Sequence, residues 1–193
     1  MKNKKVMLLT WEYPPRNLSP ISRYCRDLSV KVSHEMDMIV VTFDDWKASK
    51  SSFRMDSEGL YIFYVENSIK NTPSPLMWSL TLSSDMERVA SDIFYELDGK
   101  IDLIHANDWI TFPTAIALKK AFRRPLVVTL HSIEPTRVAG SDPYIEAIKK
   151  IEWQGTYEAD RVLVNSLWMK DKVVQYYNVP DAKIDVCTPD WNG

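Results

Sequence analysis

The chain has 193 residues and a formal net charge of −2, with 45% hydrophobic and 26% charged residues, which is the composition of one globular domain. A nearly balanced charge without a basic cluster excludes the footprint of a nucleic-acid binder and of a polybasic membrane-surface protein. Cys25 and Cys187 are the only cysteines, too few for a disulfide framework or a four-cysteine zinc site.

The first residues, MKNKK followed by VMLLT, carry the charges of a secretory signal, but the apolar stretch is too short for one and Glu12 follows it closely. No stretch approaches the ~18 apolar residues that span a bilayer. Because both thiols are expected to be reduced, we expect a cytoplasmic protein without a membrane span.

Short apolar runs then alternate with longer segments of helical period. Strands are predicted at Lys5–Thr10, Asp37–Phe43, 60–66, 102–105, Leu126–Leu130, Arg161–Val164 and, more weakly, 183–187. Helices are predicted around 21–32, 86–97, 110–121 and 145–152, and after Ser166, which can cap the last one. Residues 53–59 are expected to form a turn or hairpin, and 71–75 a loop. This alternation predicts an α/β fold, a doubly wound and mainly parallel sheet with helices on both faces.

In such a fold ligands bind beyond the carboxyl ends of the strands, so the polar residues that follow each strand are the candidates for function. After the strand at 102–105, Asp108 can accept hydrogen bonds from sugar hydroxyls and Trp109 can stack on a sugar ring. The alternative is that Asp108 only caps the helix at 110–121. After Leu126–Leu130, His131 can hydrogen-bond a substrate hydroxyl, or serve only as a structural hydrogen-bonding group.

Several catalytic motifs are missing. The sequence has no HExxH or HxxEH spacing, no GxSxG elbow, no P-loop and no GxGxxG. These absences argue against metal-dependent hydrolysis, serine hydrolases, NTPases and standard dinucleotide enzymes. We therefore expect no metal and no cofactor.

Five motifs in order resemble the N-terminal domain of glycosyltransferases with two facing Rossmann-like domains (the GT-B fold), above all the glycogen and starch synthase type. They are WEYPPR, IHANDW, TLHS, EADRVLVNS and a closing NG. The resemblance implies transfer of glucose from ADP- or UDP-glucose to an α-1,4-glucan acceptor with retention of configuration. It implies catalytic roles for His131 and Asp108. Implied substrate-binding residues are Glu12, Arg16, Asn17, Asn107, Trp109 and Ser132.

The same resemblance implies a domain over residues 1–188 and the start of an interdomain linker at 189–193. The C-terminal domain, which binds most of the donor in this type of enzyme, is absent from the sequence, so we expect it to be supplied in cis or in trans. An apolar patch of Trp46, Trp109 and residues 133–135 on the uncovered rim would favour self-association or partner binding.

The chain departs from the resemblance just before its first helix. Where the family has Lys-x-Gly-Gly-Leu beside the donor phosphates, this sequence reads Asn-Leu-Ser-Pro-Ile from Asn17 to Ile21, and Arg23 replaces an acidic residue. Ser19 is suited to the N-cap and Pro20 to the first helical position. The loop is thus expected to favour a stable helix start over phosphate binding. This departure supports an alternative interpretation, a non-catalytic glucan- or partner-binding module derived from the same fold.

Overall fold

The computed structural model describes residues 4–44 and 53–188, with only the backbone described for 53–57. Within these residues one sheet of eight strands has the order β3-β4-β2-β1-β5-β6-β7-β8. The strands are β1 (Lys5–Thr10), β2 (Asp37–Phe43), β3 (Phe53–Ser57), β4 (Leu60–Val65), β5 (Leu103–Asn107), β6 (Leu126–Leu130), β7 (Arg161–Val164) and β8 (Ile184–Val186). All neighbouring pairs are parallel except β3 with β4, which confirms the predicted mainly parallel α/β sheet.

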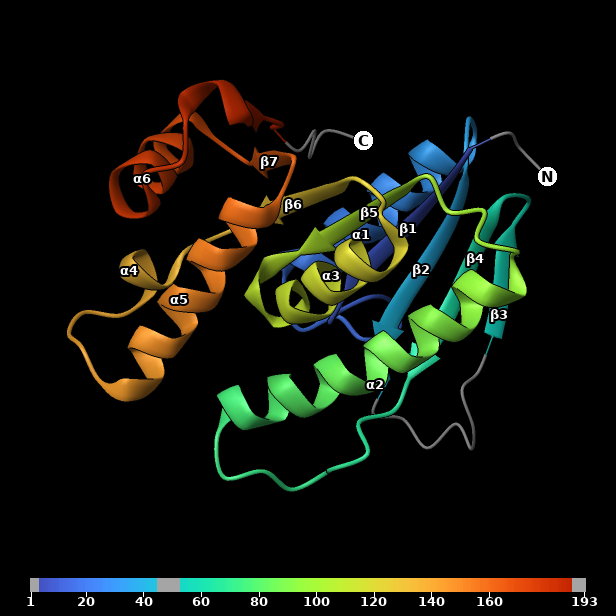
Figure 1. Cartoon of the computed structure of the whole chain (residues 1–193), viewed down its shortest axis with the longest axis horizontal. Helices are drawn as coiled ribbons and strands as arrows, with labels where there is room; N and C mark the ends of the chain where they lie inside the picture. The colour runs from blue at the N-terminus through green and yellow to red at the C-terminus, as the bar shows by residue number, and fades with distance from the viewer. Residues whose placement is uncertain (1–3, 45–52, 189–193) are drawn as a thin grey trace.

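Six α-helices and one 3-10 turn connect the described strands. They are α1 (Pro20–Ser33), α2 (Pro75–Glu96), α3 (Asp108–Phe122), α4 (Glu134–Arg137), α5 (Pro143–Glu158), α6 (Leu167–Tyr177) and the turn Asp181–Lys183. In Figure 1, α2, α3 and α5 lie in front of the sheet and α1 lies behind it. The predicted arrangement with helices on both faces is therefore confirmed.

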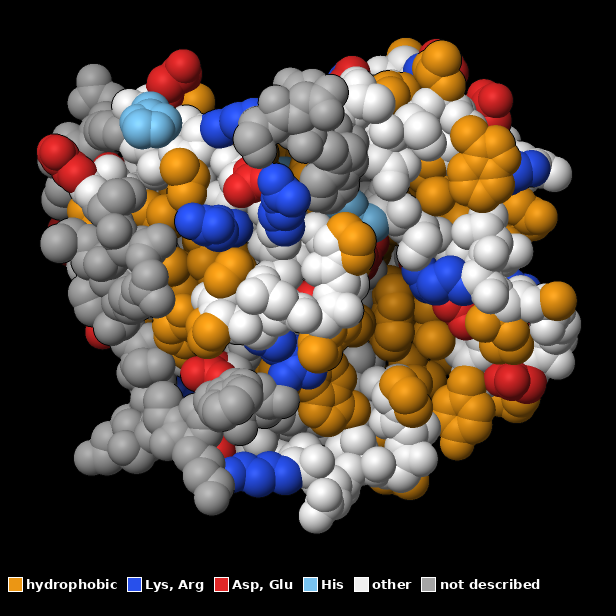
Figure 2. Space-filling view, turned by 180° about the vertical axis from the view of Figure 1, so that it is seen from behind, with side chains coloured by type: hydrophobic (Ala, Val, Ile, Leu, Met, Phe, Trp, Pro, Cys, Tyr) orange, Lys and Arg blue, Asp and Glu red, His pale blue; other side chains and the backbone are white. Residues whose placement is uncertain are grey.

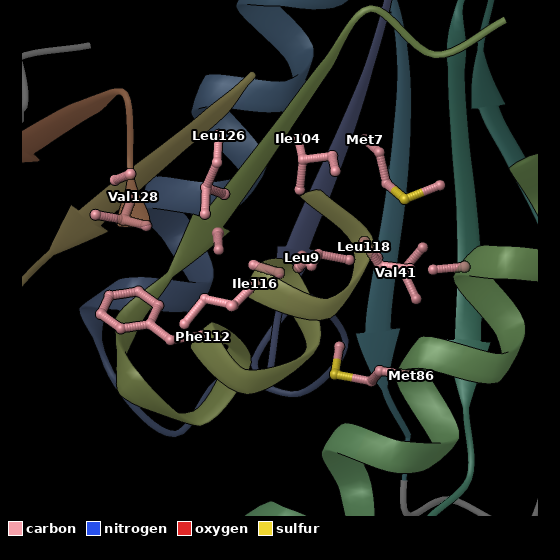
Figure 3. Close-up of a cluster of buried hydrophobic side chains, with 14 of the residues drawn as sticks. Met7, Leu9, Val41, Met86, Ile104, Phe112, Ile116, Leu118, Leu126 and Val128 are labelled. Atoms are coloured by element: carbon pink, nitrogen blue, oxygen red, sulfur yellow. The ribbon is translucent and has the colours of Figure 1, made fainter. Parts of the chain in front are cut away.

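Two apolar clusters hold these layers together. On one face Met7, Leu9 and Val41 pack with α2 and α3, including Met86 and Phe112 (Figure 3). On the other face Val6, Leu8 and Val40 pack with α1. Because strands buried on both faces have no polar side to expose, they appear in the sequence as the continuous apolar runs from which β1 and β2 were predicted.

The face behind the sheet is covered unevenly. The parallel registers place Leu103, Val127 and Leu163 on the same face as Val6, since Val6 pairs with Leu103, His105 with Val127, and Thr129 with Leu163. These three apolar side chains are only partly buried. Leu103 packs against the cluster on the α1 side, so the less covered part of this face, among the described residues, lies over Val127 and Leu163.

Several element boundaries differ from the sequence predictions. The strand expected at 102–105 runs to Asn107, and the helix expected from 110 begins directly at Asp108. The helix expected at 86–97 begins already at Pro75. Residues 53–59 form the strand of a hairpin with its turn. The proposed linker, 189–193, lies outside the described residues.

Candidate functional site

The loop after β1 is organised by the side chain of Glu12, which is fully buried. One carboxylate oxygen, Oε1, accepts the backbone N–H groups of Leu18 and Ser19. The other, Oε2, accepts the Ser19 hydroxyl at 2.7 Å. A carboxylate that accepts several N–H and O–H donors is well compensated for its burial, so Glu12 fixes the path of the chain into α1.

The start of α1 is built as the sequence predicts. Ser19 is the N-cap, and its hydroxyl accepts the Ile21 N–H at 3.2 Å, with Pro20 in the first helical position. The Asn17 side chain accepts the Ser22 hydroxyl at 2.7 Å. These contacts make a stable helix start from the loop that replaces the family's glycine pair.

Asp108 joins β5 directly to α3 through an unusual backbone conformation. Its φ is +58°, a region that few residues other than glycine adopt, although Asp and Asn tolerate it best. Asn107, not Asp108, occupies the N-cap position, and no side chain caps this helix. The side chain of Asp108 instead accepts the backbone N–H of His131 at 2.9 Å. The capping alternative for Asp108 is therefore wrong, and the residue links the ends of β5 and β6.

His131 is held from four sides. Besides the bond from its N–H to Asp108, its ring Nε2 lies 3.2 Å from Oδ1 of the buried Asn107, and its carbonyl accepts the side-chain amide of Asn165 at 3.2 Å. The edge of the Tyr24 ring packs against the imidazole with the ring centroids 4.6 Å apart. With Asn107 Oδ1 as acceptor, Nε2 carries the proton, and Nδ1 of the neutral ring is left as the acceptor.

Burial dominates the electrostatics around these residues. It raises the pKa of Asp108, an effect that the neighbouring His131 and its N–H donor oppose. Burial also lowers the pKa of His105, whose Nε2 lies 2.7 Å from the Thr129 hydroxyl, to about 4, and raises the pKa of Tyr24 and of the Cys25 thiol to about 12. His105 is therefore neutral and structural at neutral pH, and Cys25 is an unreactive thiol.

A cavity of about 560 Å³ opens beside His131. Its lining comes from the start of α1, the end of β6, the start of α6 and the segment after β8: Ser19, Pro20, Ile21, Tyr24, His131, Asn165, Ser166 and Thr188. Figure 2 shows this side of the molecule, which is hollowed near its middle where a histidine side chain reaches the surface. Among the described residues, the lining contains hydroxyl, amide and imidazole groups beside apolar surface and no Lys, Arg, Asp or Glu. Such a lining suits a neutral ligand rich in hydroxyl groups.

Among the eight site residues predicted from the sequence, His131 lines this cavity. Asp108 and Asn107 do not line it but hydrogen-bond to His131. The other five point elsewhere. Glu12 is turned to its own loop, and the Arg16 guanidinium lies 4.8 Å from the centre of the Phe43 ring. Asn17 is exposed, Trp109 packs partly buried against the core, and Ser132 accepts a hydrogen bond from Arg137 at 2.8 Å.

Sequence reasoning missed Tyr24 and Thr188 as lining residues. The spacing of Tyr24 with Ile21 and Leu28 indicated only a helix face that packs on the sheet, and no motif distinguishes a core aromatic from one at a cavity. Asn165 and Ser166 could be anticipated, because they directly follow β7. Ser166 also caps α6, as predicted, by accepting the Met169 N–H at 3.1 Å.

A buried ionic network braces the segment that follows His131. Arg137 contacts Glu134, with Nε 2.9 Å from Oε2, and also Glu152, which is fully buried on α5. Glu152 in addition accepts the Glu134 N–H at 2.8 Å and the Tyr177 hydroxyl of α6. Burial raises the pKa of Glu152 against the pull of Arg137. The network ties α4 to α5 and α6, and so fixes one wall of the site.

Across residues 4–44 and 53–188, no cluster of three or more His, Cys, Asp and Glu is placed to hold a metal ion. Over the same stretches, none of the helices is both long and apolar enough to cross a bilayer.

A mainly parallel, doubly wound sheet with this strand order has the arrangement of the N-terminal domain of a GT-B glycosyltransferase. The profile of Glycosyltransferase Family 4 matches residues 21–189, and the chain belongs to this family. The resemblance stated from the sequence is thereby confirmed.

Relatives support the same class. An uncharacterized glycosyltransferase from Methanocaldococcus jannaschii is 30% identical over 187 residues, which cover 94% of this chain and 45% of the relative. A glycogen synthase from Mycobacterium tuberculosis is 24% identical over 196 residues, covering 94% and 47%. The solved structure of sucrose-phosphate synthase from Thermosynechococcus elongatus shares the fold with a TM-score of 0.74 at 14% identity, over 96% of this chain and 48% of that one. The chain spans about half the length of the relatives it matches.

Proposed function

We propose that this chain is the acceptor-side half of a glycosyltransferase of the glycogen or starch synthase type. In the whole enzyme, glucose passes from ADP- or UDP-glucose to the end of an α-1,4-glucan with retention of configuration. His131 faces the transferred sugar, and Asp108 holds His131 in place. The donor-binding half is supplied by a C-terminal domain, in cis or in trans.

The observation that carries this proposal is the joint placement of Asp108 and His131. The carboxylate of one accepts the N–H of the other at 2.9 Å, and the imidazole borders a cavity of about 560 Å³ whose described lining residues are all uncharged types or His131 itself. A ring nitrogen held in this way can accept a hydrogen bond from a sugar hydroxyl without reorganising. The family and the glycogen synthase relative support the same chemistry.

The decisive experiment combines the chain with a cognate C-terminal half and measures the transfer of labelled glucose from ADP- and UDP-glucose to maltooligosaccharides. We expect His131→Ala to abolish transfer. His34→Ala is the matched control, because His34 is exposed at the end of α1, away from the cavity lining. Equal rates for the wild-type and His131→Ala proteins would refute the assignment.

A second candidate function is a non-catalytic module that binds a glucan or a partner protein through the same cavity. It is favoured by the loop before α1, where Ser19 and Pro20 form a capped helix start in place of a glycine pair. Titration with malto-oligosaccharides and nucleotide-sugars tests both functions. Glucan binding without nucleotide binding fits both, and the transfer assay then separates them. Tight binding of ADP-glucose by this chain alone would contradict both.

We also propose that the chain associates with itself or with its other half through apolar surface. The patch expected from the sequence requires correction, because Ile133 is fully buried in the core and Trp46 lies outside the described residues. The partly buried Leu103, Val127 and Leu163 behind the sheet offer a better surface. Light scattering at increasing concentration should show association, and a strict monomer would contradict it. Leu163→Lys should weaken association without disturbing the site.

A further inference from the structure

We infer that the start of α1 is closed to anions by Glu12, so that the cavity beside it recognises an uncharged, hydroxyl-bearing group and takes no part in binding phosphate. This inference rests on the proposed function only for the identity of the sugar. It assigns Glu12 a positioning role different from the substrate contact implied by the resemblance.

No backbone N–H over Leu18–Ile21 is left for a ligand. The N–H groups of Leu18 and Ser19 both donate to Oε1 of Glu12. Pro20 has no N–H. The N–H of Ile21 donates to the Ser19 hydroxyl oxygen at 3.2 Å. Four consecutive positions therefore offer no backbone donor to a ligand, although the beginning of a helix is ordinarily where such donors are found.

The carboxylate of Glu12 also places its charge at this helix start. The carboxylate of Glu12 is fully buried directly beneath these positions and occupies the place that a bound anion would take, since it accepts two N–H groups and the Ser19 hydroxyl at 2.7 Å. A phosphate brought to the same helix start would meet a negative charge in place of donors, in surroundings where charges are poorly screened.

The cavity beside this helix start is also poorly suited to an anion. Within residues 4–44 and 53–188, none of the side chains that line the cavity is a lysine or an arginine, so no cation of this described lining compensates a phosphate for its lost hydration. The Ser19 hydroxyl, which borders the cavity, donates to Glu12 and keeps an oxygen that accepts from Ile21. The Ser166 hydroxyl is engaged in the same way, with Asn165 and Met169. What remains for a ligand is the Tyr24, His131 and Asn165 side of the lining, whose groups match sugar hydroxyls.

This arrangement assigns the two parts of a nucleotide-sugar donor to different halves of the enzyme. The diphosphate of a nucleotide-sugar must be neutralised by groups outside this chain, while this half contacts the hexose. A glycine pair with free N–H groups would let both halves of the enzyme bind the phosphate. With Glu12 occupying the helix start, phosphate binding falls entirely to the other half.

The test is a pair of titrations of the 15N-labelled chain, followed through its backbone amide resonances. Inorganic pyrophosphate should leave the Leu18, Ser19 and Ile21 amides unchanged beyond the effect of sodium chloride at equal ionic strength. Saturable shifts of these amides, or of other amides along the cavity lining, would overturn the inference. Maltotriose forms the second arm. Its failure to shift lining residues would count against the proposed acceptor while leaving the result on anions intact.

Glu12→Ala sharpens the test. Removing the carboxylate frees the two N–H groups of Leu18 and Ser19, so a folded variant should gain a saturable pyrophosphate response at those amides. A folded variant that remains silent would show that Glu12 does not close the site. Because the wild-type titration is decisive by itself, the inference stays testable even if this substitution unfolds the loop.

Discussion

Asp108 combines backbone strain with a buried polar contact, and the two contributions can be separated by mutation. Its φ of +58° lies in the left-handed region, where a residue with a Cβ is disfavoured by about 1 kcal/mol relative to glycine. Its carboxylate also accepts the His131 N–H at 2.9 Å. An unpaired N–H in a partly buried site costs about 1–3 kcal/mol.

Asp108→Ala should therefore lower the free energy of unfolding by about 1–3 kcal/mol, because it loses the acceptor, while the strained backbone is common to the wild type and the variant. Asp108→Gly loses the same acceptor but tolerates the conformation, so it should be about 1 kcal/mol more stable than the alanine variant. Asp98 provides the control. It has φ +51° and an exposed side chain, so Asp98→Gly should be more stable than Asp98→Ala by the same strain contribution, without the loss of a buried acceptor.

Asp108→Asn tests the charge. The amide keeps an acceptor oxygen, and Asn tolerates positive φ. Because burial raises the pKa of Asp108 above its ordinary 3.8, the folded wild-type protein binds this proton more tightly than the unfolded chain does. The contribution of Asp108 to stability is therefore present below pH 3.8 and is lost as pH rises through the raised pKa. The asparagine variant should gain on the wild type with increasing pH.

Urea denaturation followed by circular dichroism measures all three variants, and an unchanged m-value shows that the folded state keeps its compactness. Asp108→Gly no more stable than Asp108→Ala would refute the strain argument. Asp108→Ala as stable as the wild type would refute the contribution of the His131 contact. A pH-independent difference between Asp108→Asn and the wild type would refute the effect of burial on the pKa.

Three further predictions concern the surrounding structure. In Gly155→Ala, the added Cβ would lie 2.1 Å from Cδ2 of the buried Phe112. Overpacking should therefore destabilise the protein by about 1–3 kcal/mol and lower its melting temperature. An unchanged melting temperature would mean that α3 and α5 can separate freely. Glu152→Gln removes the charge that faces Arg137 and should cost about 3 kcal/mol in urea denaturation, with the exposed Glu146→Gln near wild type. Because the pKa of His105 is lowered to about 4, the stability present above its unfolded value near 6.5 should fall by about 3 kcal/mol as pH drops through 4. His105→Gln should remove this contribution, and a wild-type pH profile in the variant would disprove it.

The accuracy of the sequence predictions followed the burial of each element. The ends of β1, β2, β6 and β7 were predicted correctly because these strands are short apolar runs between polar residues. The first half of α2 was missed because that helix buries small polar residues. Ser83 faces Thr114 of α3 with their hydroxyl oxygens 2.7 Å apart. Hydroxyl groups at a helix–helix contact interrupt the apolar period from which a helix is predicted.

The site was only partly predictable for a related reason. Parallel topology brings the residues after β5 and β6 to one edge, so the meeting of Asp108 and His131 follows from the order of the elements. The direction of each side chain does not follow from that order. Glu12 and Asn17 occupy the expected loop, but Glu12 accepts hydrogen bonds from that loop and Asn17 accepts one from Ser22 of α1. A loop that must satisfy its own backbone donors competes with a ligand for every polar side chain.

The residues around His131 indicate that the carboxyl edge of the sheet is a functional site. Asn107 and Asp108 stand where α3 begins, and both residue types ordinarily cap a helix there. Neither does, since one contacts the His131 ring and the other its backbone N–H, while Asp108 also adopts a strained φ. A helix start left without a side-chain cap and a strained backbone both lower stability, and such costs persist where the surrounding structure enforces a particular geometry. Here that geometry is an imidazole held in one tautomer by Asn107, beside a cavity whose other described lining residues are uncharged.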